Sequence, residues 1–175
     1  MRNTLVAAGI VLIAALSRLL PHPPNFTPIA AIALAGGVYM NRRYAMIVPL
    51  VALVISDAII GFHNTIYYVY GSFVLIGLIG LWLKSHKTPL VIFGGVLMSS
   101  VLFFLITNFG VWLAGDGLVY PRSLAGLIEC YTAGIPFFRN TMLGDVVFTA
   151  ALFGIFEGVE RTLKQSEAKR VTQDT

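Results

Sequence analysis

The chain has 175 residues, of which 57% are hydrophobic and only 11% are charged, and its mean hydropathy is +0.83. This composition excludes a soluble globular domain, because too few polar residues are available to cover a surface that faces water, and it predicts an integral membrane protein. The formal net charge of +4 does not indicate a nucleic-acid partner in so apolar a chain, and the single cysteine excludes an internal disulfide.

The first apolar segment, residues 4–20, is predicted to be a membrane helix. A hydrocarbon core about 30 Å thick requires about 20 apolar residues per helix, so the whole chain has room for five or six spans. Arg18 lies inside the outer end of this helix, where a long side chain can snorkel or pair with an acid. The segment also fits a cleavable signal peptide with a loose cleavage region at residues 14–17, although the apolar run continues beyond that region.

Residues 21–28 contain four prolines and are not expected to be helical. Each proline lacks a backbone donor and restricts the residue before it, which favours a stiff, extended loop. Such a loop serves either as a surface connector or as a preformed lid over a pocket, with His22 and Asn25 as its polar tips.

Five further apolar segments complete a predicted set of six helices, at residues 28–40, 44–61, 66–83, 89–113 and 136–160. Residues 114–135 are too polar to span the bilayer and too apolar for a free loop, so we expect a short interfacial or re-entrant helix at about residues 122–134. The predicted fold is an all-α membrane protein with six transmembrane helices. Residues 1–160 form its single domain, and residues 161–175 form a polar, disordered cytoplasmic tail.

An acid, Asp145, lies near the start of the last predicted helix. A carboxylate in hydrocarbon costs on the order of 3 kcal/mol or more, so it is expected to face a partner, water or a ligand. The helical period places it on one face with Thr141 and Thr149, while a stripe of small residues on another face is expected to pack against a helix. Alternatively, Asn140 or Thr141 caps the helix, and Asp145 lies in the field of its N-terminus.

The distribution of lysine and arginine predicts the orientation, because cytoplasmic loops retain positive charge. If the N-terminus is inside, nine basic residues are cytoplasmic and only Arg18, Arg122 and Arg139 are outside. This orientation requires an even number of crossings, in agreement with six helices. We therefore expect a multi-pass protein of the bacterial cytoplasmic (inner) membrane with both termini in the cytoplasm.

The uncommon polar side chains fall in the outer half of this topology, which favours a pocket that captures a small solute from the outer face. A proton relay or channel would continue its polar track to the other side. The sequence contains no Gly-x-Ser-x-Gly, His-Glu-x-x-His or P-loop motif, and we expect no enzyme activity, cofactor or metal. The candidate ligand-binding residues are Arg18, His22, Asn25, Asp57, His63, Tyr67, Asn108, Trp112, Cys130, Asn140 and Asp145.

Two of these candidates carry more specific expectations. Arg18 is predicted to pair with an acid of the outer half, either Asp57 or Asp145, and to close one wall of the pocket with it. Tyr67 lies with other tyrosines at the start of the fourth predicted helix. Tyrosines in this position form either a belt at the membrane interface or a wall on which a ligand stacks.

Several strings together resemble a bacterial membrane family of unknown function whose members are labelled as transport proteins. They are residues 17–34, Ser56-Asp57 with Gly61-Phe-His63, residues 107–112, and Cys130-Tyr131 followed by residues 136–145. The overall plan also resembles the substrate-binding S components of energy-coupling-factor vitamin importers. This resemblance implies an outward pocket closed by the first loops, and a coupling subunit with paired ATPases as partners.

The first helix lacks the Ala-x-x-x-Ala pair that many S components use to dock on the coupling subunit. Whether this chain has a coupling subunit as a partner therefore stays an open question. Some small proteins similar to S components act alone in cobalamin uptake, and Cys130 makes cobalamin one candidate solute. Two other classes also remain open. One is a membrane enzyme that acts on a lipid or isoprenoid substrate, and the other is an accessory subunit that packs through the small residues of the last helix.

Overall fold

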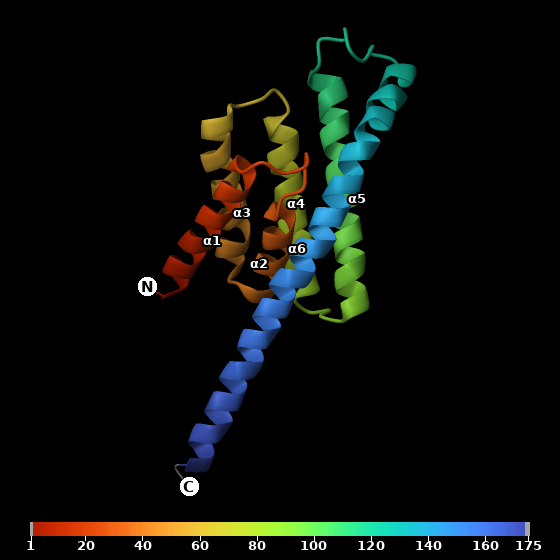
Figure 1. The fold of residues 1–175 in the computed structure, drawn as a ribbon. Coiled ribbons are helices and arrows are strands. Elements are labelled where there is room, and N and C mark those ends of the chain that lie inside the picture. Colours follow the sequence, from red (N-terminus) through yellow and green to blue (C-terminus); the bar gives the residue numbers. More distant parts are fainter. Residues whose placement is uncertain (1, 174–175) are drawn as a thin grey trace.

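Six α-helices make up most of residues 2–173, the part of the chain that the computed structural model describes (Figure 1). No strand occurs among these residues. The helices are α1 (Arg2–Leu19), α2 (Ile29–Tyr39), α3 (Arg42–Ile60), α4 (Ile66–Leu83), α5 (Pro89–Ala114) and α6 (Leu124–Gln173).

Local sequence signals account for several of these boundaries. The side chain of Asn41 accepts a hydrogen bond from the backbone N–H of Arg43 and caps α3, and Thr88 caps α5 in the same way through Val91. At the other end of α3, Gly61 has a φ of 110°, a conformation that favours glycine and that ends the helix.

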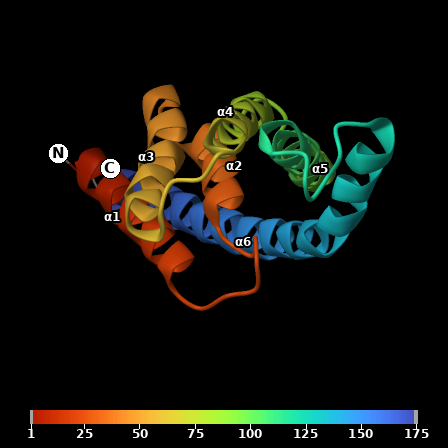
Figure 2. The same cartoon turned by 90° about the horizontal axis from the view of Figure 1, so that it is seen from above.

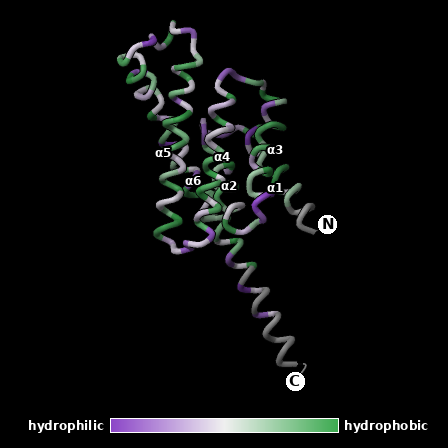
Figure 3. Tube along the Cα trace, turned by 180° about the vertical axis from the view of Figure 1, so that it is seen from behind, coloured by the Kyte–Doolittle hydropathy of each residue, from purple (hydrophilic) through white to green (hydrophobic). Residues whose placement is uncertain are grey.

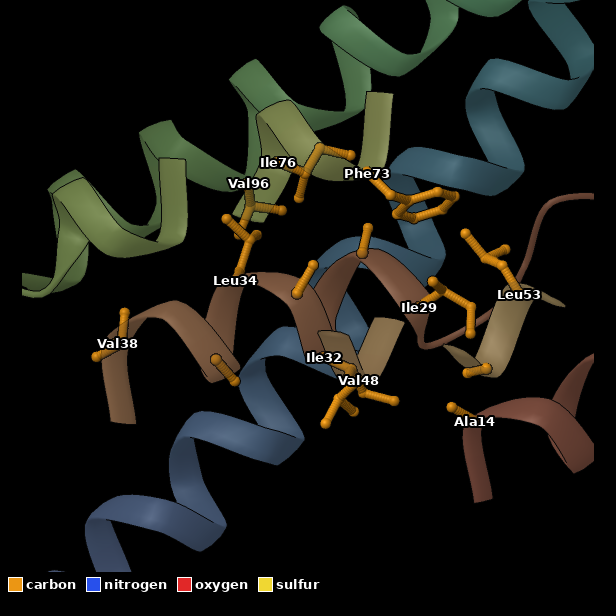
Figure 4. Packing of buried hydrophobic residues seen from close by; sticks show 14 of the residues in the cluster. Ala14, Ile29, Ile32, Leu34, Val38, Val48, Leu53, Phe73, Ile76 and Val96 are labelled. Atoms are coloured by element: carbon orange, nitrogen blue, oxygen red, sulfur yellow. The ribbon is translucent and has the colours of Figure 1, made fainter. Parts of the chain in front are cut away.

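The short helix α2 lies in the middle of the bundle, where it contacts α3, α4 and α6 (Figure 2). Every residue from Ile29 to Val38 is buried, which explains why this helix is apolar on all sides. In Figure 4, Leu34 faces Ile76 and Val96 on one side of α2, while Ile32 faces Val48 on the other.

The backbones of α2 and α4 touch where Gly37 meets Gly80. A Cβ atom added at Gly80 would lie 2.7 Å from the carbonyl oxygen of Leu34, closer than real Cβ contacts come. The absence of side chains at these two positions therefore allows the crossing, as expected for a helix rich in small residues.

The extent of helix α6 differs from the prediction at both of its ends. Residues 122–134 do not form a separate interfacial or re-entrant helix, because α6 begins at Leu124 and continues through Pro136, with a bend between its first turns and the rest (Figure 2). A proline removes one intrahelical hydrogen bond, whereas a break in an apolar environment would leave several backbone groups unpaired.

The tail was predicted to be disordered, and this prediction is wrong up to residue 173, because α6 includes these residues; residues 174–175 lie outside the described part. The tail contains two Lys, two Arg, two Gln and one Glu, residue types that favour helix, and it extends a helix that is already nucleated.

Four described helices are long and apolar enough to cross a membrane: α3, α4, α5 and the part of α6 from Leu124 to Val159. Shorter apolar helical stretches cover Ala7–Leu19 and Ile29–Tyr39. Large apolar side chains such as Leu12, Ile47 and Leu105 are exposed, which suits contact with lipid, and hydrophobic residues dominate the bundle (Figure 3). These features are those of a helical membrane protein.

The small-residue stripe of α6 does not pack against another helix of this chain, contrary to expectation. A Cβ atom added at Gly154 or Gly158 would have no neighbour within 4 Å, and both residues line an open groove of about 720 Å³ between α5 and α6. Helices α3 and α4 pack against α2, and α1 packs against α3, so none of them covers this face.

Candidate functional site

A cavity of about 370 Å³ lies where the six helices converge with the loops at residues 20–28 and 61–65. Each helix and both loops contribute at least one side chain to its wall. The apolar part of the wall includes Phe73 and Phe103, whose ring centroids are 5.4 Å apart. The polar part consists of Arg18, His22, Asn25, Thr27, His63, Thr141 and Asp145.

Arg18 reaches this cavity from the last turn of α1 and forms an ion pair with Asp57 of α3, with 2.7 Å between Nη1 and Oδ1. The Asp57 side chain is 1% exposed and also accepts a hydrogen bond of 2.9 Å from the Tyr70 hydroxyl. Arg18 donates to the Ser56 hydroxyl and to the Leu53 carbonyl oxygen as well. The predicted pair is confirmed with Asp57 as its acid, and Asp57 lies behind Arg18 rather than on the cavity wall.

Asp145 reaches the cavity from the opposite side, on α6, and is 2% exposed. Its Oδ2 accepts a hydrogen bond of 2.7 Å from the hydroxyl of Ser100 on α5. Among the described residues, Asp145 has no ion-pair partner. The alternative in which Asn140 or Thr141 caps the helix beside it is wrong, because α6 begins more than four turns earlier.

The proline-rich loop lies over the cavity and is tied to α6. The side-chain amide of Asn140 donates to the carbonyl oxygen of Pro24 at 3.1 Å, and the rings of Phe26 and Phe148 lie 5.2 Å apart. A Cβ atom at Gly144 would lie 3.3 Å from the Cα of Phe26, so a small residue lets the loop approach α6. These contacts favour the lid interpretation over a simple surface connector.

A second hollow of about 270 Å³ adjoins the cavity and contains two more of the predicted residues, Asn108 and Cys130. Asn25 lines both spaces, as do Val69 and Phe103. The Cys130 side chain is buried, and its thiol donates to the carbonyl oxygen of Asn108 at 3.4 Å.

Four predicted residues line neither space: Asp57 and Asn140, whose contacts are given above, and Tyr67 and Trp112. Tyr67 is 84% exposed and lines neither space. It lies on a different face of α4 from Phe73, which lines the cavity. The indole of Trp112 donates to the carbonyl oxygen of Pro121 and holds the loop between α5 and α6, also outside both spaces.

Sequence reasoning missed several groups that complete the site, among them Ser100, Tyr70 and Thr27. A signal for Ser100 was available, because Ser99 and Ser100 lie in the middle of a predicted membrane helix, where serine side chains often donate to a neighbouring helix. Tyr70 was treated together with Tyr67, and only the rotation of α4 separates the half-buried Tyr70, which donates to Asp57, from the exposed Tyr67.

Comparisons with known proteins give a family without an assigned function. A model described as Family of unknown function (DUF6580) matches residues 1–167 of the 175-residue chain. No curated protein and no solved structure was found to match the chain.

Proposed function

The chain belongs to the DUF6580 family, and we propose that it is a membrane protein that binds a small organic solute for uptake, in a pocket open to the outer face. The observation that carries this proposal is the cavity of about 370 Å³, which places seven polar side chains inside an otherwise apolar helical bundle. Buried polar groups in a membrane protein are costly and are typically retained where they bind or transport something.

The lid supports solute capture rather than an open channel. The proline-rich loop contributes His22, Asn25 and Thr27 to the wall, and its contacts with α6 close the space from one end. Opening the lid would admit a solute, and closing it would exclude water, as in other pre-formed ligand sites.

The two ends of the bundle support the proposed orientation. The loops at residues 20–28, 61–65 and 115–123 lie toward one end in Figure 1, and the turns near residues 41 and 84–88, which carry most of the internal basic residues, lie at the other. Placing the basic end in the cytoplasm puts the lid and the cavity at the outer face of a bacterial inner membrane.

The volume bears on the class of solute. The cavity of about 370 Å³ falls at the lower end of the range for small-molecule sites, about 300–1,000 Å³, and the adjoining hollow of about 270 Å³ lies just below that range. A single ring system with polar substituents, as in a vitamin precursor or a small vitamin, fits this space better than a corrinoid. Whether a coupling subunit with ATPases drives uptake belongs to the same proposal and rests on the resemblance to S components.

The proposal is tested by purifying the protein in mild detergent, extracting it and identifying retained small molecules by mass spectrometry. We expect one solute at near-stoichiometric amount. His22→Ala and Asn25→Gly, which alter only the lid, should weaken its binding about tenfold each, or about 1.4 kcal/mol, measured by calorimetry on ligand-free protein.

Tyr67→Phe is the matched control, because this exposed tyrosine lies outside both spaces and its replacement should leave affinity unchanged. Turnover of an added lipid would favour the membrane enzyme instead. A stable hetero-complex without any retained solute would favour the accessory subunit.

A further inference from the structure

The charges around the cavity do not cancel. Arg18 is compensated within the protein, because it lies 2.7 Å from the Asp57 carboxylate. Asp145 lines the same cavity, is 2% exposed and has no ion-pair partner among the described residues. If Arg18, Asp57 and Asp145 are all ionised, these three groups together carry one negative charge that no other described group compensates.

The hydrogen bonds of Asp145 are also incomplete. A carboxylate offers about four acceptor sites on its two oxygens. Ser100 occupies one of them through Oδ2, and Thr141 does not supply another, because its hydroxyl donates to the Phe137 carbonyl oxygen at 2.9 Å. Oδ1 therefore remains available to a donor inside the cavity.

The other titratable groups of the wall do not supply that donor. His22 and His63 lie on the two loops, and each uses its Nδ1 locally, with the Leu20 carbonyl oxygen at 2.6 Å and the Thr65 hydroxyl at 2.8 Å. Neither forms an ion pair with Asp145. A buried carboxylate without a counter-charge is costly, and a cationic solute in the cavity would supply the charge that the described residues do not.

The apolar wall suggests the rest of the ligand. Phe73 and Phe103 present two tilted rings to the cavity, and aromatic faces attract both flat rings and organic cations. A compact apolar or aromatic body with one protonated nitrogen satisfies both parts of the wall.

We propose that the solute is an organic cation whose protonated nitrogen, an ammonium or amidinium group, pairs with Asp145 while its ring lies against Phe73 and Phe103. This inference rests on the proposed function and deepens it by naming the substrate class. Specificity follows from the carboxylate, because a neutral or anionic analogue would leave it unpaired and desolvated.

The test uses three probes of matched size, phenethylammonium, 2-phenylethanol and 3-phenylpropionate, with ligand-free protein in detergent. We expect phenethylammonium to bind at least tenfold more tightly than either analogue, measured by calorimetry. Asp145→Asn keeps the shape of the side chain and an acceptor for Ser100, and it should remove this preference. Tyr67→Phe should retain it.

Equal or tighter binding of the alcohol or the carboxylate would overturn the cation assignment while leaving a small-solute pocket in place. Retention of the ammonium preference in Asp145→Asn would overturn the role of Asp145. Failure of all three probes, together with purified protein that carries no solute, would overturn both this inference and the proposed function. If the purified protein carries a neutral or anionic solute, the function stands and the substrate class is wrong.

Discussion

Arg18 and Asp57 depend on each other, since Asp57 is 1% exposed and Arg18 is its ion-pair partner. Among the described residues, Tyr70, Ser56 and the Leu53 carbonyl oxygen provide the other polar contacts of this pair. Removing one member of a buried pair leaves the other charge unpaired, which costs about 3–5 kcal/mol, whereas removing both costs much less. We expect Arg18→Met to lower the free energy of unfolding by that amount, and Arg18→Met with Asp57→Leu to recover most of it, measured by thermal unfolding in detergent.

The control for this prediction is Arg139, whose side chain is exposed on α6. Arg139→Met should change stability by no more than about 0.5 kcal/mol. A double variant that is no more stable than Arg18→Met alone would show that the arginine acts through headgroups or the solute instead of through Asp57.

At the scale of the helices, the crossing of α2 and α4 depends on glycine. Gly80→Ala would place a methyl group 2.7 Å from the Leu34 carbonyl oxygen, and backbone cannot move aside as a flexible side chain can. We expect a loss of about 1–3 kcal/mol in stability from this overpacking, measured by thermal unfolding.

Gly71 lies on the same helix, and a Cβ atom there would meet nothing within 4 Å. Gly71→Ala should therefore be neutral or stabilise the protein by up to about 1 kcal/mol through helix propensity. If both variants behave alike, the close approach of α2 and α4 does not limit stability.

For the whole molecule, the orientation in the membrane is the property to test. Single cysteines introduced on a Cys130→Ser background as Asn64→Cys, Val119→Cys and His86→Cys sample the loops at the two ends. An impermeant maleimide should label residues 64 and 119 in intact cells, and residue 86 only after lysis, because the turn at 84–88 carries positive charge and is expected in the cytoplasm.

The Cys130→Ser chain without an introduced cysteine is the background control and should not react, and the native chain should react weakly because Cys130 is buried. Strong labelling of residue 86 from outside would reverse the orientation and place the lid and the cavity on the cytoplasmic side.

Sequence alone determined the class of protein and the positions of most helices. Hydrophobic runs, the prolines of residues 21–28 and the glycine at 61 act locally, and the boundaries of α2 to α5 accordingly agree with prediction to within about two residues. The hydropathy pattern also identified the rare polar side chains of the predicted helices. Because each of them is costly in an apolar bundle, they were candidates for a functional site.

Tertiary structure decided what those polar residues contact. The choice of Asp57 over Asp145 as partner of Arg18 depends on how α1, α3 and α6 are rotated and placed, which no local pattern encodes. The same reason separates Tyr70 from Tyr67 on one helix. The continuity of α6 through Pro136 was also settled only in the folded bundle, because a membrane helix retains its backbone hydrogen bonds where the isolated sequence suggests a break.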